Sequence, residues 1–219
     1  MIRLYNYQRE HTLVRMPDRV IDLGDAGAFN EIIIHNPNPR EEMEINGSLF
    51  TSIHTIDPPV GKRVFTALRS EKEPTVLLII WRGFPYYRQI EEGGDLMLQV
   101  LHSEKQVLHL IIDNSYVQSG WMDDRMKDYL NNGWMPGLIQ LGLKGFCHLQ
   151  AETYLGALSF KKFGELVSEN ISRIAQSLDR EPFTYYPIKT SELSKNGAIN
   201  EAMRLAALTE SLRILKSLG

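Results

Sequence analysis

Four polar residues lie within or directly after the apolar runs of this chain, and their types could hold a small ligand. They are Arg82, Asp113, Asn114 and His148. In an α/β sheet the carboxyl ends of neighbouring strands meet at one edge, where ligands commonly bind. We therefore expect these side chains to approach one another around a ligand crevice. The alternative is that Asp113 and Asn114 only cap their strand through hydrogen bonds to the backbone.

No other group of residues in the sequence has the types and spacing of a catalytic or metal-binding site. The histidines are scattered without the spacing that metal sites use. A Cys147 nucleophile with His148 as its base fails, because adjacent strand residues point to opposite faces of a sheet. General acid-base catalysis needs paired titratable groups, which no local motif supplies. The sequence therefore predicts neither an enzyme nor a metal or cofactor site. The histidines are His11, His35, His54, His102, His109 and His148.

Composition limits the partners. The chain has 219 residues, a formal net charge of −3 and a pI near 6.1, so it lacks the excess basic charge of nucleic-acid binders. Residues 1–7 lack the apolar core of a signal peptide, and no window reaches 18 uninterrupted apolar residues. A single cysteine, Cys147, excludes an internal disulfide. We expect a cytoplasmic protein that neither binds nucleic acid nor spans a membrane.

The elements that must position these residues follow a parallel α/β pattern. Residues 76–81 and 107–112 are short apolar runs typical of strands covered on both faces, and residues 145–150 are expected to form the third strand of the sheet. Helix periodicity separates them at residues 86–102 and 123–141. Residues 63–68 should pair with 76–81 as an antiparallel hairpin, a further helix should span most of 160–177, and residues 183–188 should form an edge strand because of Pro187. Residues 198–218 predict a closing helix.

The charge distribution indicates a separate N-terminal unit. Residues 1–60 carry five Arg and nine Asp or Glu, so the acidity lies wholly in this segment. Consecutive prolines at 58 and 59 favour a boundary, which divides the chain into a β-rich extension at 1–60 and an α/β domain at 61–219. Short strands are expected at 13–16, 19–23, 31–35 and 48–54. An extension of this size should pack on the main domain or on a second copy of the chain.

Several segments of the larger unit resemble STAS-like proteins of the SpoIIAA-like group, the sulfate-transporter and anti-sigma-factor-antagonist fold, which is akin to lipid-carrying CRAL-TRIO domains. The resemblance covers roughly residues 62–190. It implies a mixed sheet of four to five strands with the helices at 86–102 and 123–141 packed side by side on one face. The segments that carry it are 81–84 (Trp-Arg-Gly-Phe), 112–114 (Ile-Asp-Asn), 129–136 (Tyr-Leu-Asn-Asn-Gly-Trp-Met-Pro) and 141–146 (Leu-Gly-Leu-Lys-Gly-Phe).

The loop after the second apolar run holds two further candidates for a partner surface. In anti-sigma-factor antagonists a serine at the start of a helix accepts a phosphate, and Ser119 is the nearest counterpart here. Asp123 and Asp124 would repel a phosphate bound close by, so a plain turn serine is the alternative. Trp121 could form an exposed partner surface, whereas Trp134 has the helical spacing of a core residue.

Two functional hypotheses follow. The first is a non-catalytic, STAS-like protein-interaction or regulatory module, which binds a protein partner or itself, with a homodimer as one form. The second is a carrier that holds a small apolar or amphipathic ligand in a cavity under the helix pair, as the kinship to CRAL-TRIO domains implies.

Overall fold

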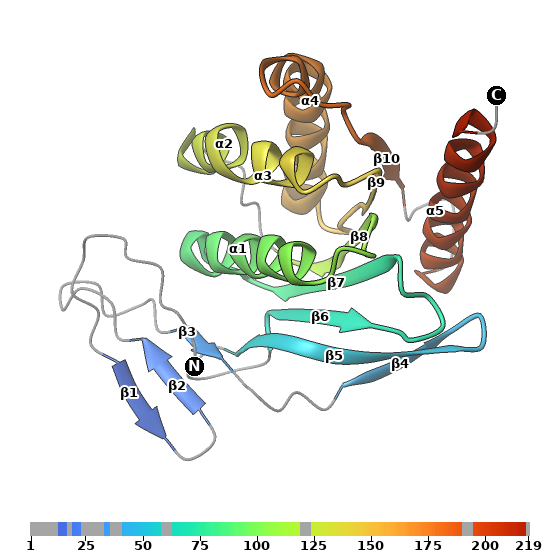
Figure 1. The fold of residues 1–219 in the computed structure, drawn as a ribbon. Coiled ribbons are helices and arrows are strands. Elements are labelled where there is room, and N and C mark those ends of the chain that lie inside the picture. The colour runs from blue at the N-terminus through green and yellow to red at the C-terminus, as the bar shows by residue number, and fades with distance from the viewer. Residues whose placement is uncertain are drawn as a thin grey trace.

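In a computed structural model of the chain, the described residues form ten strands in one mixed sheet (Figure 1). The order is β1-β2-β3-β5-β6-β7-β8-β9-β10, with β4 paired to β5. The structure describes residues 13–16, 19–22, 33–35, 41–57, 63–118, 124–189 and 195–217. The strands are β1 (Leu13–Met16), β2 (Arg19–Asp22), β3 (Ile33–His35), β4 (Glu42–Ile45), β5 (Ser48–Asp57), β6 (Phe65–Arg69), β7 (Val76–Gly83), β8 (His109–Val117), β9 (Gly145–Leu149) and β10 (Thr184–Ile188).

The sheet is antiparallel in its first half and parallel in its second. Strands β5, β6 and β7 pair as neighbours in antiparallel register, which confirms the predicted hairpin of β6 and β7. Strands β7, β8, β9 and β10 are parallel, and β10 is the edge strand, as its proline predicts. Strand β4 was not expected. It forms a hairpin with β5 because Asn46 and Gly47, at φ 51° and 74°, take the left-handed conformation that a two-residue turn needs.

Helices cover both faces of the sheet. Three crossover segments lie on one face. The first is α1 (Tyr87–Ser103) and the third is α4 (Tyr154–Ser177). The second is a continuous run of α2 (Asp124–Tyr129), a π-helix (Leu130–Trp134) and α3 (Met135–Gln140). The last helix, α5 (Lys195–Ser217), lies on the opposite face (Figure 1). Three of the four buried residues among its described side chains are alanines, at 198, 202 and 206, and the fourth is Ile199; the Cys147 thiol donates to the carbonyl oxygen of Ala202 at 3.6 Å.

Two expectations about the architecture need correction, although the α/β class and the shared face of α1 and the α2–α3 run are confirmed. A sheet of four to five strands is too small, since β4 to β10 alone number seven. The expectation that the helices lie on one face only is also wrong. The interior strands alternate their apolar side chains, so Leu110 and Ile112 face α1 while Ile111 faces α5. Both faces need a cover because both are apolar.

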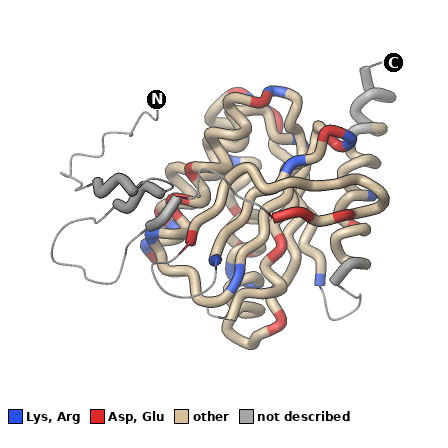
Figure 2. The backbone as a smooth tube through the Cα atoms, turned by 90° about the horizontal axis from the view of Figure 1, so that it is seen from below, with Lys and Arg blue, Asp and Glu red and all other residues tan. Residues whose placement is uncertain are grey.

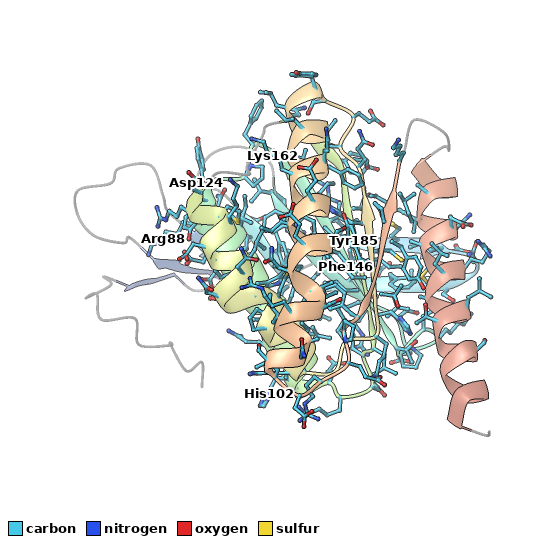
Figure 3. The ribbon with its side chains drawn as sticks, turned by 90° about the horizontal axis from the view of Figure 1, so that it is seen from above. Arg88, His102, Asp124, Phe146, Lys162 and Tyr185 are labelled. Carbon is cyan, nitrogen blue, oxygen red and sulfur yellow. The ribbon has the colours of Figure 1, made fainter. Side chains whose placement is uncertain are left out.

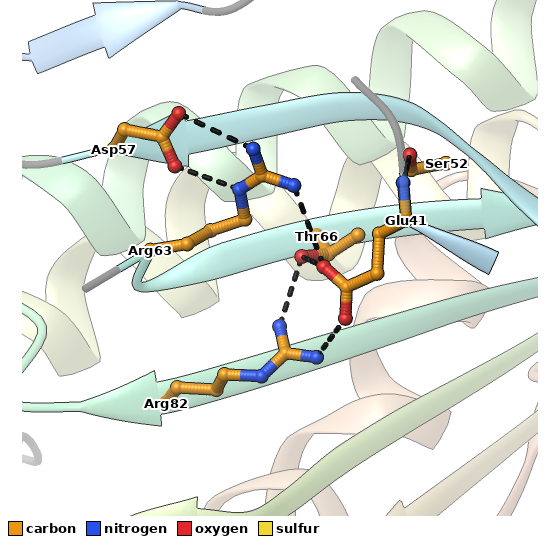
Figure 4. Close-up of polar contacts among 6 residues, drawn as sticks. All are labelled: Glu41, Ser52, Asp57, Arg63, Thr66 and Arg82. Atoms are coloured by element: carbon orange, nitrogen blue, oxygen red, sulfur yellow. Dashed lines mark hydrogen bonds and ion pairs between the residues drawn. The ribbon is translucent and has the colours of Figure 1, made fainter. Parts of the chain in front are cut away.

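The described part of the N-terminal segment packs in cis. Strand β5 lies along β6, and Phe50 and Ile56 are fully buried. Polar contacts reinforce the junction (Figure 4): the Glu41 carboxylate accepts from Arg82 and from Thr66 Oγ1 (2.9 Å), and Arg63 Nε donates to Asp57 Oδ1 (2.7 Å). The proposed boundary falls on residues 58–62, outside the described residues, so the division at 60 remains a prediction.

Charged residues of both signs are interspersed along the described backbone (Figure 2). In the N-terminal segment, Glu41 and Asp57 pair with Arg63, and Glu41 also pairs with Arg82.

Helix α1 contains a buried glycine pair that its packing requires. A Cβ atom on Gly93 would lie 2.6 Å from Cη2 and 2.7 Å from Cζ2 of Trp81. A Cβ on Gly94 would lie 2.3 Å from the Tyr129 hydroxyl and 3.1 Å from Trp134 Cδ1. These glycines weaken the isolated helix by about 1 kcal/mol each, but they let α1 approach the sheet and the α2–π segment closely.

We expect Gly93→Ala to lower the free energy of unfolding by about 1 to 3 kcal/mol, because overpacking exceeds the gain in helix propensity. Gly164→Ala in α4 is the matched control. Its new methyl group would meet its nearest atoms, in Tyr185, at 3.6 Å, so that variant should gain roughly 0.5 to 1 kcal/mol. Urea unfolding of the three proteins measures both values. A Gly93→Ala protein that is more stable than the wild type would contradict the close approach.

Candidate functional site

A pocket lies between the sheet, α1 and the α2–π segment. It is near the carboxyl ends of β7 and β8, as expected for a ligand crevice in a parallel sheet. Its cavity volume is about 40 Å³. The walls are mainly apolar, and the lining residues include no Lys, Arg, Asp or Glu. They are Trp81, Pro85, Ile90, Gly94, Met97, Ile112, Asn114, Val117, Tyr129, Leu130, Trp134, Phe146, His148 and Phe163.

The π-helix directs two side chains into this wall. The backbone N–H of Met135 donates to the carbonyl oxygen of Leu130, five residues earlier, in place of the usual four. Pro136 follows, and its missing N–H makes a regular α-helical ladder impossible at this point. The widened turn places both Leu130 and Trp134 in the pocket lining. Such π turns occur often at functional sites.

The polar centre of the pocket is the contact between Asn114 and His148. Asn114 Nδ2 lies 2.7 Å from His148 Nε2, and His148 Nδ1 lies 3.1 Å from the Tyr185 hydroxyl. Figure 3 shows Tyr185 beside Phe146 near α4. The His148 ring stacks on Phe146 with ring centroids 5.7 Å apart. Phe160 and Phe163 lie 4.7 Å and 4.9 Å from it.

This histidine is neutral at physiological pH. Burial lowers the pKa of His148 to about 3, because the charged imidazolium would lose its hydration among aromatic rings. Burial also raises the pKa of the Tyr185 hydroxyl, which therefore stays protonated. The chain from Asn114 to Tyr185 is thus a set of uncharged hydrogen bonds.

Two further polar side chains of the lining, besides His148 and Tyr129, are Trp134 and Asn114. Trp134 is 3% exposed, and its Nε1 has no hydrogen-bond partner in the described part of the chain. The Asn114 amide bonds His148 through one of its two polar atoms, and its other atom makes no side-chain hydrogen bond to a described residue. Leaving a buried donor unpaired costs about 1 to 3 kcal/mol, so the Trp134 N–H is a feature to be explained.

Tyr129 joins the two helical walls of the pocket. Its hydroxyl lies 3.0 Å from Asp95 Oδ1 and 3.0 Å from the carbonyl oxygen of Glu91, both on α1. Burial raises the pKa of Asp95, and burial followed by the nearby charge of Asp95 raises the pKa of Glu91. The two hydrogen bonds of the Tyr129 hydroxyl fix α2 against α1 beside the pocket.

The predicted site residues divide into three groups. Asn114 and His148 come together in the pocket. Asp113 does not join them: its side chain accepts from the backbone N–H (2.9 Å) and hydroxyl (2.6 Å) of Ser115, as in the capping alternative. Arg82 also lies apart, bonded to Glu41 and to Thr66 Oγ1 (2.9 Å). Ser119 and Trp121 lie outside the described residues.

Sequence reasoning assigned Trp134 to the core and did not assign it to a site. It is indeed buried, but it also lines the pocket. The sequence does contain a sign of the irregular turn that places Trp134 in the pocket. Asn131-Asn132-Gly133 precede Trp134 and Pro136, and such residues inside a helix often mark an irregular turn. Cys147 and His148 do face opposite sides, and burial raises the pKa of Cys147 to about 12.

In the described part of the chain no three His, Cys, Asp or Glu side chains gather where they could hold a metal ion. Within the same residues, no helix has the length and apolar character that crossing a membrane requires.

Comparison of the chain with protein-family models, with curated proteins and with solved structures gave no match.

Proposed function

We propose that this protein is a non-catalytic binding protein for a small, uncharged, largely apolar ligand, held between the sheet, α1 and the α2–π segment. The observation that carries the proposal is the apolar pocket with one buried, uncharged polar centre at Asn114 and His148. Small-molecule sites commonly combine apolar walls with a few placed polar groups in this way.

The chemistry of the pocket favours binding over catalysis. His148 stays neutral and has both ring nitrogens occupied, by Asn114 and by Tyr185. A general base needs a titratable group that can take a proton near the working pH, and the low pKa of His148 removes that ability. A charged ligand is disfavoured too, because a buried charge needs a partner of opposite sign.

The size of the cavity limits the ligand. At about 40 Å³ it has room for roughly three water molecules, since one water takes about 10 to 15 Å³ on this scale. A cavity that admits benzene measures about 150 Å³. The ligand, or the part of it that enters, therefore has only a few non-hydrogen atoms, and a long lipid chain is excluded unless the helices separate.

We also infer a STAS-like relationship and a cytoplasmic location. The parallel order β7-β8-β9-β10 with three crossover segments on one face supports the first, together with the segments quoted from the sequence. A single, buried cysteine supports the second, because a reducing compartment does not favour disulfides.

A second candidate, the protein-interaction module, is favoured by exposed apolar residues at the carboxyl end of the parallel strands. Phe84, Tyr116 and Tyr154 are 60%, 40% and 81% exposed. They lie near one another, because the N–H of Gln118 donates to the carbonyl oxygen of Gly83 and the Thr153 hydroxyl donates to that of Val117. Such a surface suits a second copy of the chain. Native mass spectrometry distinguishes the candidates: a dimer without added mass supports the second, and a monomer that retains a small molecule supports the first.

Xenon is a direct probe of the proposed pocket, because it enters small apolar cavities. We expect xenon to shift the indole N–H signals of Trp81 and Trp134 in a ¹H–¹⁵N spectrum, and these shifts should reach a plateau as the xenon concentration rises. Ile90→Phe should abolish these shifts, because Ile90 lines the pocket and is only partly buried. Ile171→Phe is the matched control, since Ile171 packs on the same core but does not line the pocket. Unsaturable shifts, or shifts unchanged by Ile90→Phe, would refute the proposed site.

A further inference from the structure

Arg82 lies in a polar cluster on the sheet face opposite the pocket. Trp81, the residue before it, packs in the core cluster with α1 and lines the pocket. Adjacent strand residues point to opposite faces of a sheet. Arg82 accordingly bonds Thr66 of β6, whose neighbour Phe65 packs in the same core cluster as Trp81. The polar cluster is therefore separate from the pocket.

Three donors in this cluster converge on one carboxylate (Figure 4). Glu41 Oε2 accepts from Thr66 Oγ1 at 2.9 Å and from Arg63 Nη1 at 3.4 Å, and Glu41 Oε1 accepts from Arg82 Nη2. Arg82 Nη1 also donates to Thr66 Oγ1 at 2.9 Å, so the hydroxyl proton is directed to the carboxylate. Two guanidinium groups and one hydroxyl thus hold both oxygens of Glu41.

The same donors suit a small oxyanion from outside the chain. A guanidinium group binds carboxylate and phosphate oxygens with the same fork of N–H donors. The side chains of Arg63, Arg82 and Glu41 are 25%, 25% and 27% exposed, so solvent reaches the cluster. Without Glu41, the two arginines and Asp57 together carry one net positive charge. An anion that takes the place of the Glu41 carboxylate would restore neutrality.

The Glu41 side chain can leave these donors while its backbone stays attached to β5. The Glu41 N–H donates to Ser52 Oγ, and the Ser52 N–H donates to the Glu41 carbonyl oxygen, both at 2.9 Å. Neither bond involves the carboxylate. Partly exposed ion pairs are weak, because water competes for both charges. A competing anion therefore has only a weak contact to displace.

We propose that Arg63, Thr66 and Arg82 form a binding site for a small oxyanion, a carboxylate or phosphate group, and that the Glu41 carboxylate is an internal competitor for this site. The external anion takes the position that the Glu41 carboxylate holds in the structure. Because the site lies outside the pocket, its absence would leave the proposed function unaffected.

Inorganic phosphate, titrated at pH 7 and constant ionic strength, tests the site. The side-chain Nε–H signals of Arg63 and Arg82 in a ¹H–¹⁵N spectrum follow binding. Glu41→Ala should bind phosphate about fivefold or more tightly than the wild type, because an internal competitor lowers the apparent affinity in proportion to the time for which the site is free. Adding Arg82→Gln to this variant should abolish the gain.

Asp57→Ala is the matched control. It makes the same change in net charge and also takes a carboxylate from Arg63, whose Nε donates to Asp57 Oδ1 at 2.7 Å. Glu41 remains in the site, so the affinity for phosphate should rise by about twofold or less. If Glu41→Ala does not fold, Glu41→Gln replaces it in the comparison, because glutamine keeps the length of the side chain and removes its charge.

Acetate, titrated in the same way, separates the two kinds of oxyanion. Tighter binding of phosphate by Glu41→Ala supports a site for phosphate groups, and tighter binding of acetate supports a site for carboxylates. Equal phosphate affinities of the wild type and Glu41→Ala overturn the proposal, because Glu41 would then not compete for the site. An equal gain in Asp57→Ala also overturns it, since a general effect of net charge would explain both variants.

Discussion

Phe50→Ala is expected to lower the free energy of unfolding by about 3 to 5 kcal/mol, a large fraction of the total stability of an ordinary domain. Phe50 is fully buried in β5 and packs in the cluster beneath α5. Truncating it removes the apolar area and leaves a cavity that close-packed neighbours fill only in part. Urea unfolding monitored by circular dichroism measures the change.

Leu49→Ala is the matched control for this prediction. Leu49 is the preceding residue of the same strand, but its side chain points to the other face and is 51% exposed. Its replacement should change the free energy of unfolding by about 0.5 kcal/mol or less. Equal effects of the two substitutions would mean that β5 does not pack as described.

Removing the whole N-terminal segment extends the same argument. A protein that begins at Gly61 loses β4 and β5, so β6 becomes an open edge and its apolar neighbours are exposed. We expect it to aggregate or to change its oligomeric state in light scattering. A protein that begins at Glu41 keeps both strands and serves as the control. If the shorter protein stayed soluble, equally stable and of unchanged mass, the N-terminal strands would be dispensable.

The second large effect is a loss of stability in mild acid caused by His148. Its folded pKa of about 3 lies below the ordinary value of 6.5, because burial disfavours the charged ring. Between these values the unfolded chain binds a proton that the folded chain does not, so stability falls as the pH falls. The contribution is fully present above pH 6.5, and the slope approaches about 1.4 kcal/mol per pH unit inside the window.

From pH 7 to pH 5 the wild type should therefore lose about 2 kcal/mol more than His148→Gln. Glutamine removes the titration and keeps a hydrogen-bonding group for Asn114. Urea unfolding at both pH values gives the two differences, and His102→Gln, at the exposed end of α1, is the control. Burial also lowers the pKa of His54, against an opposing effect of Glu104, and raises that of Asp95, but these groups are common to both proteins and cancel. Parallel pH dependences would show that His148 is not buried as a neutral ring.

The sequence determined the local elements and the parallel core of this protein. Residues 76–81 and 107–112 are apolar at nearly every position, and only strands covered on both faces need that pattern. Pro187 placed β10 at the edge because it cannot donate to a ladder. The alternation of side chains along a strand was sufficient to separate Cys147 from His148.

The tertiary structure alone decided which polar residues meet. Asn114 and His148 are 34 residues apart in sequence and bond because β8 and β9 are neighbours in one register, with Ile112 opposite His148. Asp113, one residue before Asn114, faces the other side and bonds Ser115. The pocket itself depends on a π turn and on glycines that admit Trp81, Tyr129 and Trp134. Such close approaches arise from packing between distant segments, which local periodicity does not encode.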